Sequence, residues 1–393
     1  MRVLWVTDVF PHAGRPYKGA WLVDLARALS RSAEIVVLSP RYRFLWTPGG
    51  SFLEWYLGQP PVVDHGGVRT LYPAAAAVPW AFTMAVQSVS MAHAFLPVAR
   101  REHLRRRFDL VHGHFIIPGG VAAAWIARRL SLPLVVTAHG SDVNVFSRVR
   151  HLRPFFNTAC GRAAGITAVS RDLVSSLERL GFGGARWIPA GCLMGDVDPT
   201  ARVKGRILFV GQLWEWKGPE VLLEAFAKVK REVPDATLDL AGEGEDASRL
   251  RERASSLGFG SAVRFLGPVP HEQMMSLMGQ ADVFCLPSRR EGLPVSVIEA
   301  FAAGAPVVGS AVGGMGELVH GPELGFLVPP GDAAALAEAL LRALRTPWDR
   351  ERIRTEADGY DLGRIAVRYL DVYREVIASR RIRSSSVATA GAE

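Results

Sequence analysis

The feature that most constrains the fold is an alternation of short apolar strands with amphipathic helices, which runs through the chain twice. Val3–Val6 is apolar and rich in β-branched residues, and Ala20–Leu29 then carries apolar residues at helical spacing. Further strands are expected at Ile35–Leu38, Leu110–Val111, Leu134–Thr137, Ile166–Ala168 and Trp187–Ile188, with helices at 119–130 and 170–180. Short apolar strands separated by helices predict a parallel sheet with both faces covered.

The pattern restarts after about Gly191. Strands are expected at Ile207–Val210, Thr237–Leu240, Val263–Leu266, Val283–Leu286, Val307–Val308 and Phe326–Val328, with helices between them. We therefore predict an α/β protein of two doubly wound domains, 1–190 and 205–360. Residues 191–204 have no periodicity and several turn-forming residues, which indicates a linker. Two such domains facing each other would enclose a central cleft at the carboxyl ends of their strands.

Composition narrows the classes further. With 49% hydrophobic and 21% charged residues, most of the 393-residue chain can form a buried core. The three cysteines are scattered, which argues against a disulfide scaffold or zinc ribbon and fits a reducing compartment. The first residues lack the pattern of a secretory signal, so we expect a cytoplasmic protein.

Charge is unevenly distributed. Residues 1–200 hold 22 Lys and Arg against 12 Asp and Glu, whereas residues 201–393 hold 24 against 26. A basic first domain attracts nucleic acid, anionic lipid or anionic substrates. Nucleic acid is disfavoured, because the chain has neither zinc-finger spacing nor an aromatic RNA-binding motif.

Residues 70–99 carry no charge and precede an arginine cluster at residues 100, 101, 105, 106 and 107. The favoured interpretation is a buried or interfacial helix. A membrane span is disfavoured because Pro79, Pro97 and several polar residues interrupt the segment. The remaining alternative is a helix on an anionic membrane surface, at the inner face of the membrane, although the arginines could equally form a solvated helix face.

The most informative stretch runs from Ala281 to Pro330. A strand ends in a polar loop, and a helix is predicted to begin at Pro294, because proline is favoured at the first helical position. Free amides at a helix start suit an anion such as diphosphate. Glu291 in the loop is suited to sugar hydroxyls, and Glu299 in the helix to the vicinal hydroxyls of a ribose. Alternatively, Glu291 caps the helix and Glu299 is a surface residue.

Four motifs in and beside this stretch resemble the donor-binding half of family 4 glycosyltransferases. They lie at Pro287–Ala300, Ala303–Val308, Gly313–Glu317 and Gly325–Asp332. The resemblance implies a GT-B fold, a nucleotide-diphosphate sugar donor, no metal or other cofactor, and retention of anomeric configuration. It also implies that Glu291 holds the donor sugar and Glu299 the ribose. Backbone amides of Gly292, Leu293 and the neighbourhood of Pro294 would face the donor, with Pro294 itself contributing shape only.

A second match is FVGQLWEWKG at Phe209–Gly218, which resembles the strand–loop motif that opens the family's second domain. Gly211 would let the backbone approach the phosphates, and Lys217 would neutralise the leaving diphosphate. The family usually has Arg where this chain has Gln212, which carries no charge. Arg15, Arg289 and Arg290 are candidate replacements, and the sequence does not choose among them.

The first half resembles the family more loosely. Phe10–Gly19 resembles the loop after the first strand, where Gly19, or else Gly14, would approach the donor phosphate. His139, after a predicted strand, would contact the donor sugar or orient groups at the reacting centre, and we assign it a catalytic role with Glu291 and Lys217. His112, His114 and Asp142 are expected to line the acceptor cleft. Two histidines at this spacing could also bind a metal, but no carboxylate pairs with them suitably.

The resemblance covers nearly the whole chain. It implies that the final helix, 361–378, crosses back to the first domain, and residues 379–393 are expected to be disordered. Val269 is expected near the base, whose identity the sequence does not reveal. The predicted function is transfer of a sugar to an acceptor hydroxyl. A basic first domain suits a lipid-linked or otherwise anionic acceptor, and a polysaccharide precursor or a small metabolite would also fit. The alternatives are a sugar-nucleotide epimerase or hydrolase, or a partner subunit with a degraded site.

Overall fold

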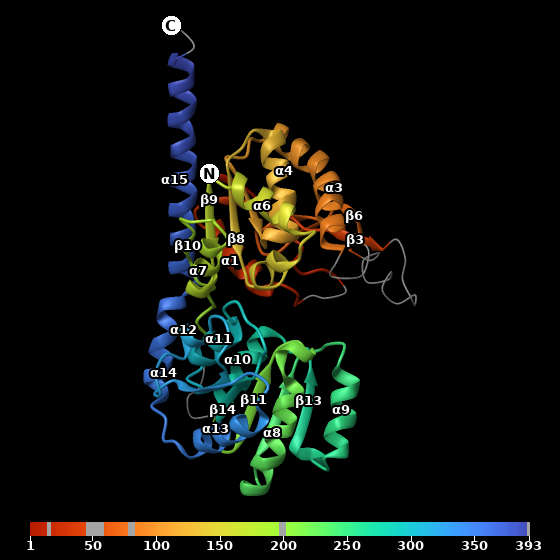
Figure 1. Ribbon diagram of the computed structural model, residues 1–393, viewed down its shortest axis with the longest axis vertical. Coiled ribbons are helices and arrows are strands. Elements are labelled where there is room, and N and C mark those ends of the chain that lie inside the picture. Colours follow the sequence, from red (N-terminus) through yellow and green to blue (C-terminus); the bar gives the residue numbers. More distant parts are fainter. Residues whose placement is uncertain (14–16, 45–58, 78–82, 196–201, 391–393) are drawn as a thin grey trace. The chain divides into compact units, whose positions relative to one another are not determined.

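The computed structural model describes residues 1–13, 17–44, 59–77, 83–195 and 202–390 (Figure 1). It contains two compact units. The first comprises Met1–Pro189 together with Leu362–Glu393, and the second comprises Ala190–Asp361. The described part of the expected linker, from Gly191 onward, thus belongs to the second unit. Gly14 and Arg15 lie outside the described residues.

The first unit is built on an eight-stranded sheet of order β10-β9-β8-β7-β1-β2-β5-β4. All neighbouring strands in it are parallel except the pair β4 and β5. The strands are β1 (Arg2–Val6), β2 (Glu34–Leu38), β4 (Val62–Asp64), β5 (Arg69–Leu71), β7 (Leu110–His114), β8 (Leu134–Ala138), β9 (Gly165–Ala168) and β10 (Arg186–Trp187). Strands β3 (Arg41–Phe44) and β6 (Ala74–Ala77) form a separate parallel pair. The strand order reverses between β1 and β7.

Helices cover both faces of this sheet, as the sequence pattern predicts. Side chains alternate along β1, so that Val3 and Trp5 pack with α1 (Ala20–Ser30) and α15 (Leu362–Ala390). Leu4 and Val6 pack on the opposite side with α3 (Met84–Arg105) and α4 (Val121–Leu130). The remaining helices are α5 (Ser141–Asn144), α6 (Arg153–Arg162) and α7 (Arg171–Arg179).

Residues 84–99 of the uncharged segment 70–99 belong to α3, whose buried face includes Met91, Phe95 and Ala99. This agrees with the favoured interpretation of a helix packed on the fold. Among the described residues, no helix is long and apolar enough to cross a membrane.

Helix α15 contributes Ile365, Tyr369 and Tyr373 to the core of the first unit. In the structure this helix is drawn as far as Ala390. The composition allows this, since the segment up to Ala390 contains alanine and arginine and has no glycine or proline to end the helix.

The second unit has a six-stranded, fully parallel sheet of order β13-β12-β11-β14-β15-β16. Its strands are β11 (Arg206–Val210), β12 (Thr237–Ala241), β13 (Val263–Gly267), β14 (Val283–Leu286), β15 (Val307–Ser310) and β16 (Gly325–Val328). Its helices are α8 (Pro219–Glu232), α9 (Ala247–Ser256), α10 (His271–Gln280), α11 (Val295–Ala302), α12 (Met315–Leu318), α13 (Ala333–Arg345) and α14 (Arg350–Ala357). The order reverses between β11 and β14, and open parallel sheets bind ligands at such a reversal.

Candidate active site

The strand-order reversal of the second unit brings two predicted catalytic residues into contact. Lys217 follows β11 and Glu291 follows β14, and these strands are hydrogen-bonded neighbours. Lys217 Nζ lies 2.7 Å from Glu291 Oε1. Ser288 Oγ donates to the same carboxylate oxygen at 2.6 Å. Residues 74 positions apart thus form one charged cluster because the fold juxtaposes their loops.

Both charged groups of this cluster are largely removed from water. Glu291 is only 9% exposed. The ammonium of Lys217 also lies 4.5 Å from the centre of the Trp216 ring, a distance at which a cation is attracted to an aromatic face. Buried charges require partners. Here Lys217 and the Ser288 hydroxyl hold the Glu291 carboxylate in place. The carboxylate and the Trp216 ring in turn hold the Lys217 ammonium.

The loop that carries Glu291 is fixed against the loop after β11. The backbone N–H of Arg289 donates to the Trp216 carbonyl at 2.8 Å. Gly218 adopts φ +72°, and a Cβ there would lie 2.1 Å from the Pro287 carbonyl oxygen. Only glycine permits both this backbone conformation and this close approach. The contact between Lys217 and Glu291 therefore depends on a glycine-mediated junction.

The same loop is fixed on its other side by the segment after β15. Gly314 N–H donates to the Gly292 carbonyl at 2.9 Å. A Cβ on Gly313, which adopts φ +50°, would lie 2.1 Å from the Glu291 carbonyl oxygen. Glycines of the G-G-x-x-E motif thus position the backbone of Glu291.

Helix α11 begins one residue later than predicted. Pro294 is the N-cap, with φ −74° and ψ 112°, and the helix starts at Val295. Proline's fixed φ also suits an extended residue just before a helix, which explains the difference. Glu299 lies within α11 and is half-buried. Burial and the nearby Glu299 carboxylate raise the pKa of Cys192 to about 12.

Other predicted donor residues lie on the loops that follow these strands. Gly211 follows β11 directly and donates to the Ala241 carbonyl. Gln212 is exposed, Leu293 is buried, and Gly292 and Val269 are half-buried, with Val269 two residues beyond β13.

Two arginines that could replace the missing charge at Gln212 lie beside Glu291. Arg290 places its guanidinium 5.5 Å from the centre of the Trp216 ring, which Lys217 also contacts. An added Cβ on Gly331 would lie 3.5 Å from Arg289 Nη1, so this guanidinium extends toward the loop after β16. Arg290 is therefore the candidate whose contacts connect it to the Lys217 cluster.

The corresponding region of the first unit contains histidine and aromatic rings in place of a lysine–glutamate pair. Gly19 immediately precedes α1, and its carbonyl accepts from Leu22 N–H at 2.9 Å. His139 follows β8, and its ring lies 4.9 Å from Trp21 and 4.4 Å from Phe115. Burial lowers the pKa of His139 to about 3, so its imidazole is neutral at physiological pH.

His112 does not have the accessible position expected of a cleft residue. It lies within β7 at 0% exposure. Its ring nitrogens contact Tyr373 Oη at 2.6 Å and Thr137 Oγ1 at 2.7 Å. The residue lies in the interior of the sheet rather than after the strand, so both nitrogens are engaged by core neighbours. His112 therefore joins β7, β8 and α15.

His114 is also fully buried, and its Nδ1 lies 3.2 Å from His139 Nε2. Its Nε2 has no hydrogen-bond partner among the described residues. Burial lowers the pKa of both His112 and His114 well below the usual range. The described residues include no group of three His, Cys, Asp or Glu side chains that could hold a metal ion.

Asp142 likewise differs from the expectation that it lines a cleft. Its carboxylate is buried and accepts backbone N–H bonds from four residues, namely Ile116, His139, Gly140 and Val143. Such a carboxylate organises backbone because it satisfies several amide donors at once. Asp142 therefore joins the loop after β7 to the loop after β8 and positions His139.

Sequence reasoning missed three residues of these two regions. Ser288 and Trp216 complete the Lys217 cluster, and both lie inside the quoted motifs. Asp8 lies two residues beyond β1, and its Oδ1 is buried without a hydrogen-bond partner among the residues described. Burial raises the pKa of Asp8. The signal was available, because Asp8 is a carboxylate placed just after the first predicted strand.

The two doubly wound units have the architecture of GT-B glycosyltransferases, and the comparisons with known proteins agree with this class. Two protein-family models match the chain. The family described as glycosyl transferases group 1 matches residues 200–359, and glycosyltransferase family 4 matches residues 19–192. Among solved structures, a sucrose-phosphate synthase from Thermosynechococcus elongatus superposes with a TM-score of 0.78, covering 96% of this chain and 99% of that one at 23% identity. Anabaena HepE in complex with UDP-glucose gives a TM-score of 0.70, covering 96% and 100% at 20% identity.

Curated relatives extend the match along the chain. A putative teichuronic acid biosynthesis glycosyltransferase of Bacillus subtilis is 30% identical over 87% of this chain and 89% of its own. A phosphatidyl-myo-inositol mannosyltransferase of Mycobacterium leprae is 32% identical over 78% and 84%. The chain belongs to the family 4 glycosyltransferases.

Proposed function

We propose that this glycosyltransferase moves a sugar from a nucleotide-diphosphate donor to an acceptor hydroxyl, with retention of configuration and without a metal ion. The observation that carries the proposal is the contact of Lys217 Nζ with Glu291 Oε1 at the reversal between β11 and β14. This is the edge at which an open parallel sheet receives a nucleotide ligand. The solved HepE complex with UDP-glucose supports a nucleotide sugar as donor.

The charges of the cluster suit departure of a diphosphate. As the bond between the anomeric carbon and the phosphate oxygen breaks, negative charge grows on that oxygen. Lys217 and the free amides at the start of α11 can stabilise this charge in a site with little water. Glu291 balances the lysine before the donor arrives and then accepts hydrogen bonds from sugar hydroxyls.

Retention is proposed to follow from attack on the face that the diphosphate leaves. The acceptor oxygen forms a bond to the anomeric carbon, and its proton passes to the departing phosphate oxygen. This path needs no protein nucleophile, and Glu291 shapes and polarises the donor. The neutral imidazole of His139 is proposed to contact the donor sugar.

The acceptor is proposed to be lipid-linked or a polysaccharide precursor. The named activities of the relatives from Bacillus and Mycobacterium support these two classes. A sugar-nucleotide epimerase or hydrolase would use the same donor site, and a degraded partner subunit would not turn over. The charged cluster supports an active enzyme over the latter, because both catalytic charges are present and in contact.

The first unit also has a surface suited to an anionic membrane, and we propose peripheral association there. A hollow of about 850 Å³ between α3 and α4 combines arginines with aliphatic side chains, including Arg100, Arg101 and Leu104. Leu104 is 76% exposed. Sedimentation with phosphatidylglycerol vesicles should exceed that with phosphatidylcholine vesicles. Equal sedimentation of wild type and Arg100→Gln/Arg101→Gln with the anionic vesicles would reject this surface.

The catalytic proposal is tested by donor turnover. UDP-, GDP- and ADP-sugars are incubated with the protein in EDTA, and release of nucleoside diphosphate is measured with and without candidate lipid or polysaccharide acceptors. We expect one nucleotide series to react, with an acceptor-dependent rate and a product of retained anomeric configuration by NMR. Acceptor-independent epimerisation, or inversion, would contradict the proposal.

A further inference from the structure

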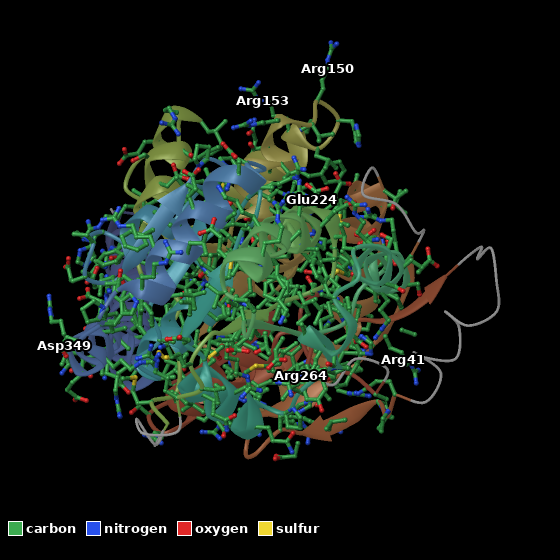
Figure 2. All side chains as sticks on the ribbon, turned by 90° about the horizontal axis from the view of Figure 1, so that it is seen from below. Arg41, Arg150, Arg153, Glu224, Arg264 and Asp349 are labelled. Carbon is green, nitrogen blue, oxygen red and sulfur yellow. The ribbon has the colours of Figure 1, made fainter. Side chains whose placement is uncertain are left out.

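An arginine-lined hollow in the first unit is separate from the residues discussed above. It has a volume of about 350 Å³ and lies where α5, the start of α6 and the end of α7 meet. Arg148, Arg150, Arg153 and Arg179 line it, together with the hydroxyl residues Ser147 and Ser176. None of the lining residues that the structure describes is acidic. Figure 2 shows Arg150 and Arg153 on this part of the fold, with Arg150 extending away from the ribbon.

The four arginines lack the ion pairs that several other surface arginines of this protein form. Arg105, Arg186 and Arg249 each pair with a carboxylate, those of Glu102, Glu375 and Glu220. Within the described part of the chain, none of the four arginines lining the hollow lies within 4.0 Å of a carboxylate oxygen. Four unbalanced guanidinium groups around one hollow attract an anion, because like charges gathered together repel until a counter-charge binds.

The chemistry of the lining specifies the kind of anion. A guanidinium group presents several N–H donors in a plane and binds phosphate oxygens in pairs. Ser176 Oγ already accepts from Arg179 Nη2 at 2.9 Å, which orients that guanidinium. Four such groups exceed what a single carboxylate can satisfy, so a phosphate or diphosphate group matches them better.

The hollow adjoins the loop of the first unit that carries His139. Its lining begins at Val143, four residues after His139. The same Asp142 carboxylate accepts the backbone N–H groups of His139 and Val143. A ligand held in the hollow is therefore connected by one rigid turn to the residue proposed to contact the donor sugar, whereas Lys217 and Glu291 belong to the other unit.

We propose that this hollow binds a phosphate or diphosphate group carried by the acceptor. The assignment of the bound group to the acceptor rests on the proposed function, whereas the anion site itself does not. The same phosphate chemistry is present on a soluble phosphorylated acceptor and on the headgroup of a lipid-linked one.

The test is calorimetric titration of pyrophosphate with an excess of whichever of UDP, GDP and ADP the wild type binds, so that the donor site is occupied. The variant Arg150→Gln/Arg153→Gln should bind pyrophosphate at least about tenfold more weakly than wild type. Arg162→Gln is the matched control, because Arg162 is exposed on α6, as Arg153 is, but does not line the hollow. Equal pyrophosphate affinity in wild type, control and double variant would overturn the proposal.

A second arm separates the two sources of phosphate. Sedimentation is measured with phosphatidylcholine vesicles with and without an isoprenoid phosphate. If the double variant sediments less than wild type only with the phosphate-bearing vesicles, the site binds a lipid headgroup. A loss of pyrophosphate binding alone would assign it to a soluble phosphorylated acceptor.

Titration of the same proteins with UDP, GDP and ADP keeps this proposal distinct from the proposed function. The double variant should bind the preferred nucleotide as wild type does. Failure of wild type to bind any nucleotide would reject the donor site while leaving the anion site standing. Weakened nucleotide binding in the double variant would instead assign the arginines to the donor and overturn the acceptor proposal.

Discussion

The two sheets of this protein reverse their strand order in the same way, yet they place different chemistry at the reversal. In the second unit, Lys217 and Glu291 form a charged pair between the loops after β11 and β14. In the first unit, His112 and His114 lie on β7, beside the reversal, as buried imidazoles. Similar topology therefore supports a charged pair in one unit and neutral imidazoles in the other.

The difference follows from what each reversal contacts. His112 bonds to Tyr373 of α15, so β7 forms part of the packing that holds the last helix. Glu291 is held by side chains and glycine junctions from neighbouring loops, which keep a carboxylate and an ammonium at the strand ends. The first reversal is mainly structural, and the second retains charges that a ligand can use.

The largest expected effect comes from the charged pair. Replacing Lys217 with Met, or Glu291 with Gln, should lower kcat by roughly 10²- to 10³-fold, as is typical when one group that stabilises transition-state charge is removed. Lys228→Met is the control, because Lys228 is a surface lysine of α8 paired with Glu338. Normal turnover of a well-folded Lys217 variant would show that the charge of the second reversal is not catalytic.

The glycine junction should be the next most sensitive feature. Gly218→Ala forces a Cβ against the Pro287 carbonyl at a positive φ, and we expect a loss of about 2–4 kcal/mol in the free energy of unfolding. Gly316→Ala is the control, since nothing lies within 4 Å of its added Cβ. Denaturant unfolding measures both variants. Equal stability would mean that the two loops are not in contact.

Acid should affect the first unit through its histidines. The folded-state pKa of His139 is about 3 and its ordinary value is 6.5, so the unfolded chain binds more protons between these values. Stability should be fully present above pH 6.5 and fall as the pH drops, by up to about 1.4 kcal/mol per pH unit for each such histidine. Thermal unfolding from pH 7 to pH 4 measures the slope, which His139→Gln should reduce. An unchanged slope would show that His139 titrates normally.

The smallest expected effect is loss of one hydroxyl in the core. Tyr373 Oη contacts His112 Nδ1 at 2.6 Å and accepts from Trp5 Nε1 at 3.2 Å. Tyr373→Phe should cost about 1–3 kcal/mol in unfolding free energy, because it leaves buried polar atoms unpaired. Tyr17→Phe is the control, since Tyr17 is exposed. Equal chemical denaturation curves for wild type and Tyr373→Phe would show that the contact between Tyr373 and His112 does not stabilise the fold.

Much of the fold was predictable because each strand is a short apolar run and each helix has a distinct period. Lys217 and Glu291 could be singled out because they stand in motifs that follow strands, and the structure brings the two side chains into contact, while their catalytic roles stay predictions. The burial of His112 could not be predicted, because a sequence does not show that a histidine inside a strand meets Tyr373 from the other end of the chain. The hydrogen bonds of Asp142 could not be predicted either, because its four backbone donors come from two loops that only the fold brings together.

The central claim is that a nucleotide diphosphate binds at the charged reversal of the second unit. The most direct measurement is calorimetric titration of UDP, GDP and ADP, in EDTA, against wild type, Lys217→Met and Lys228→Met. The account predicts binding of one nucleotide by wild type and Lys228→Met, and at least about tenfold weaker binding by Lys217→Met. Equal affinity in all three proteins, or no binding by wild type, would contradict it.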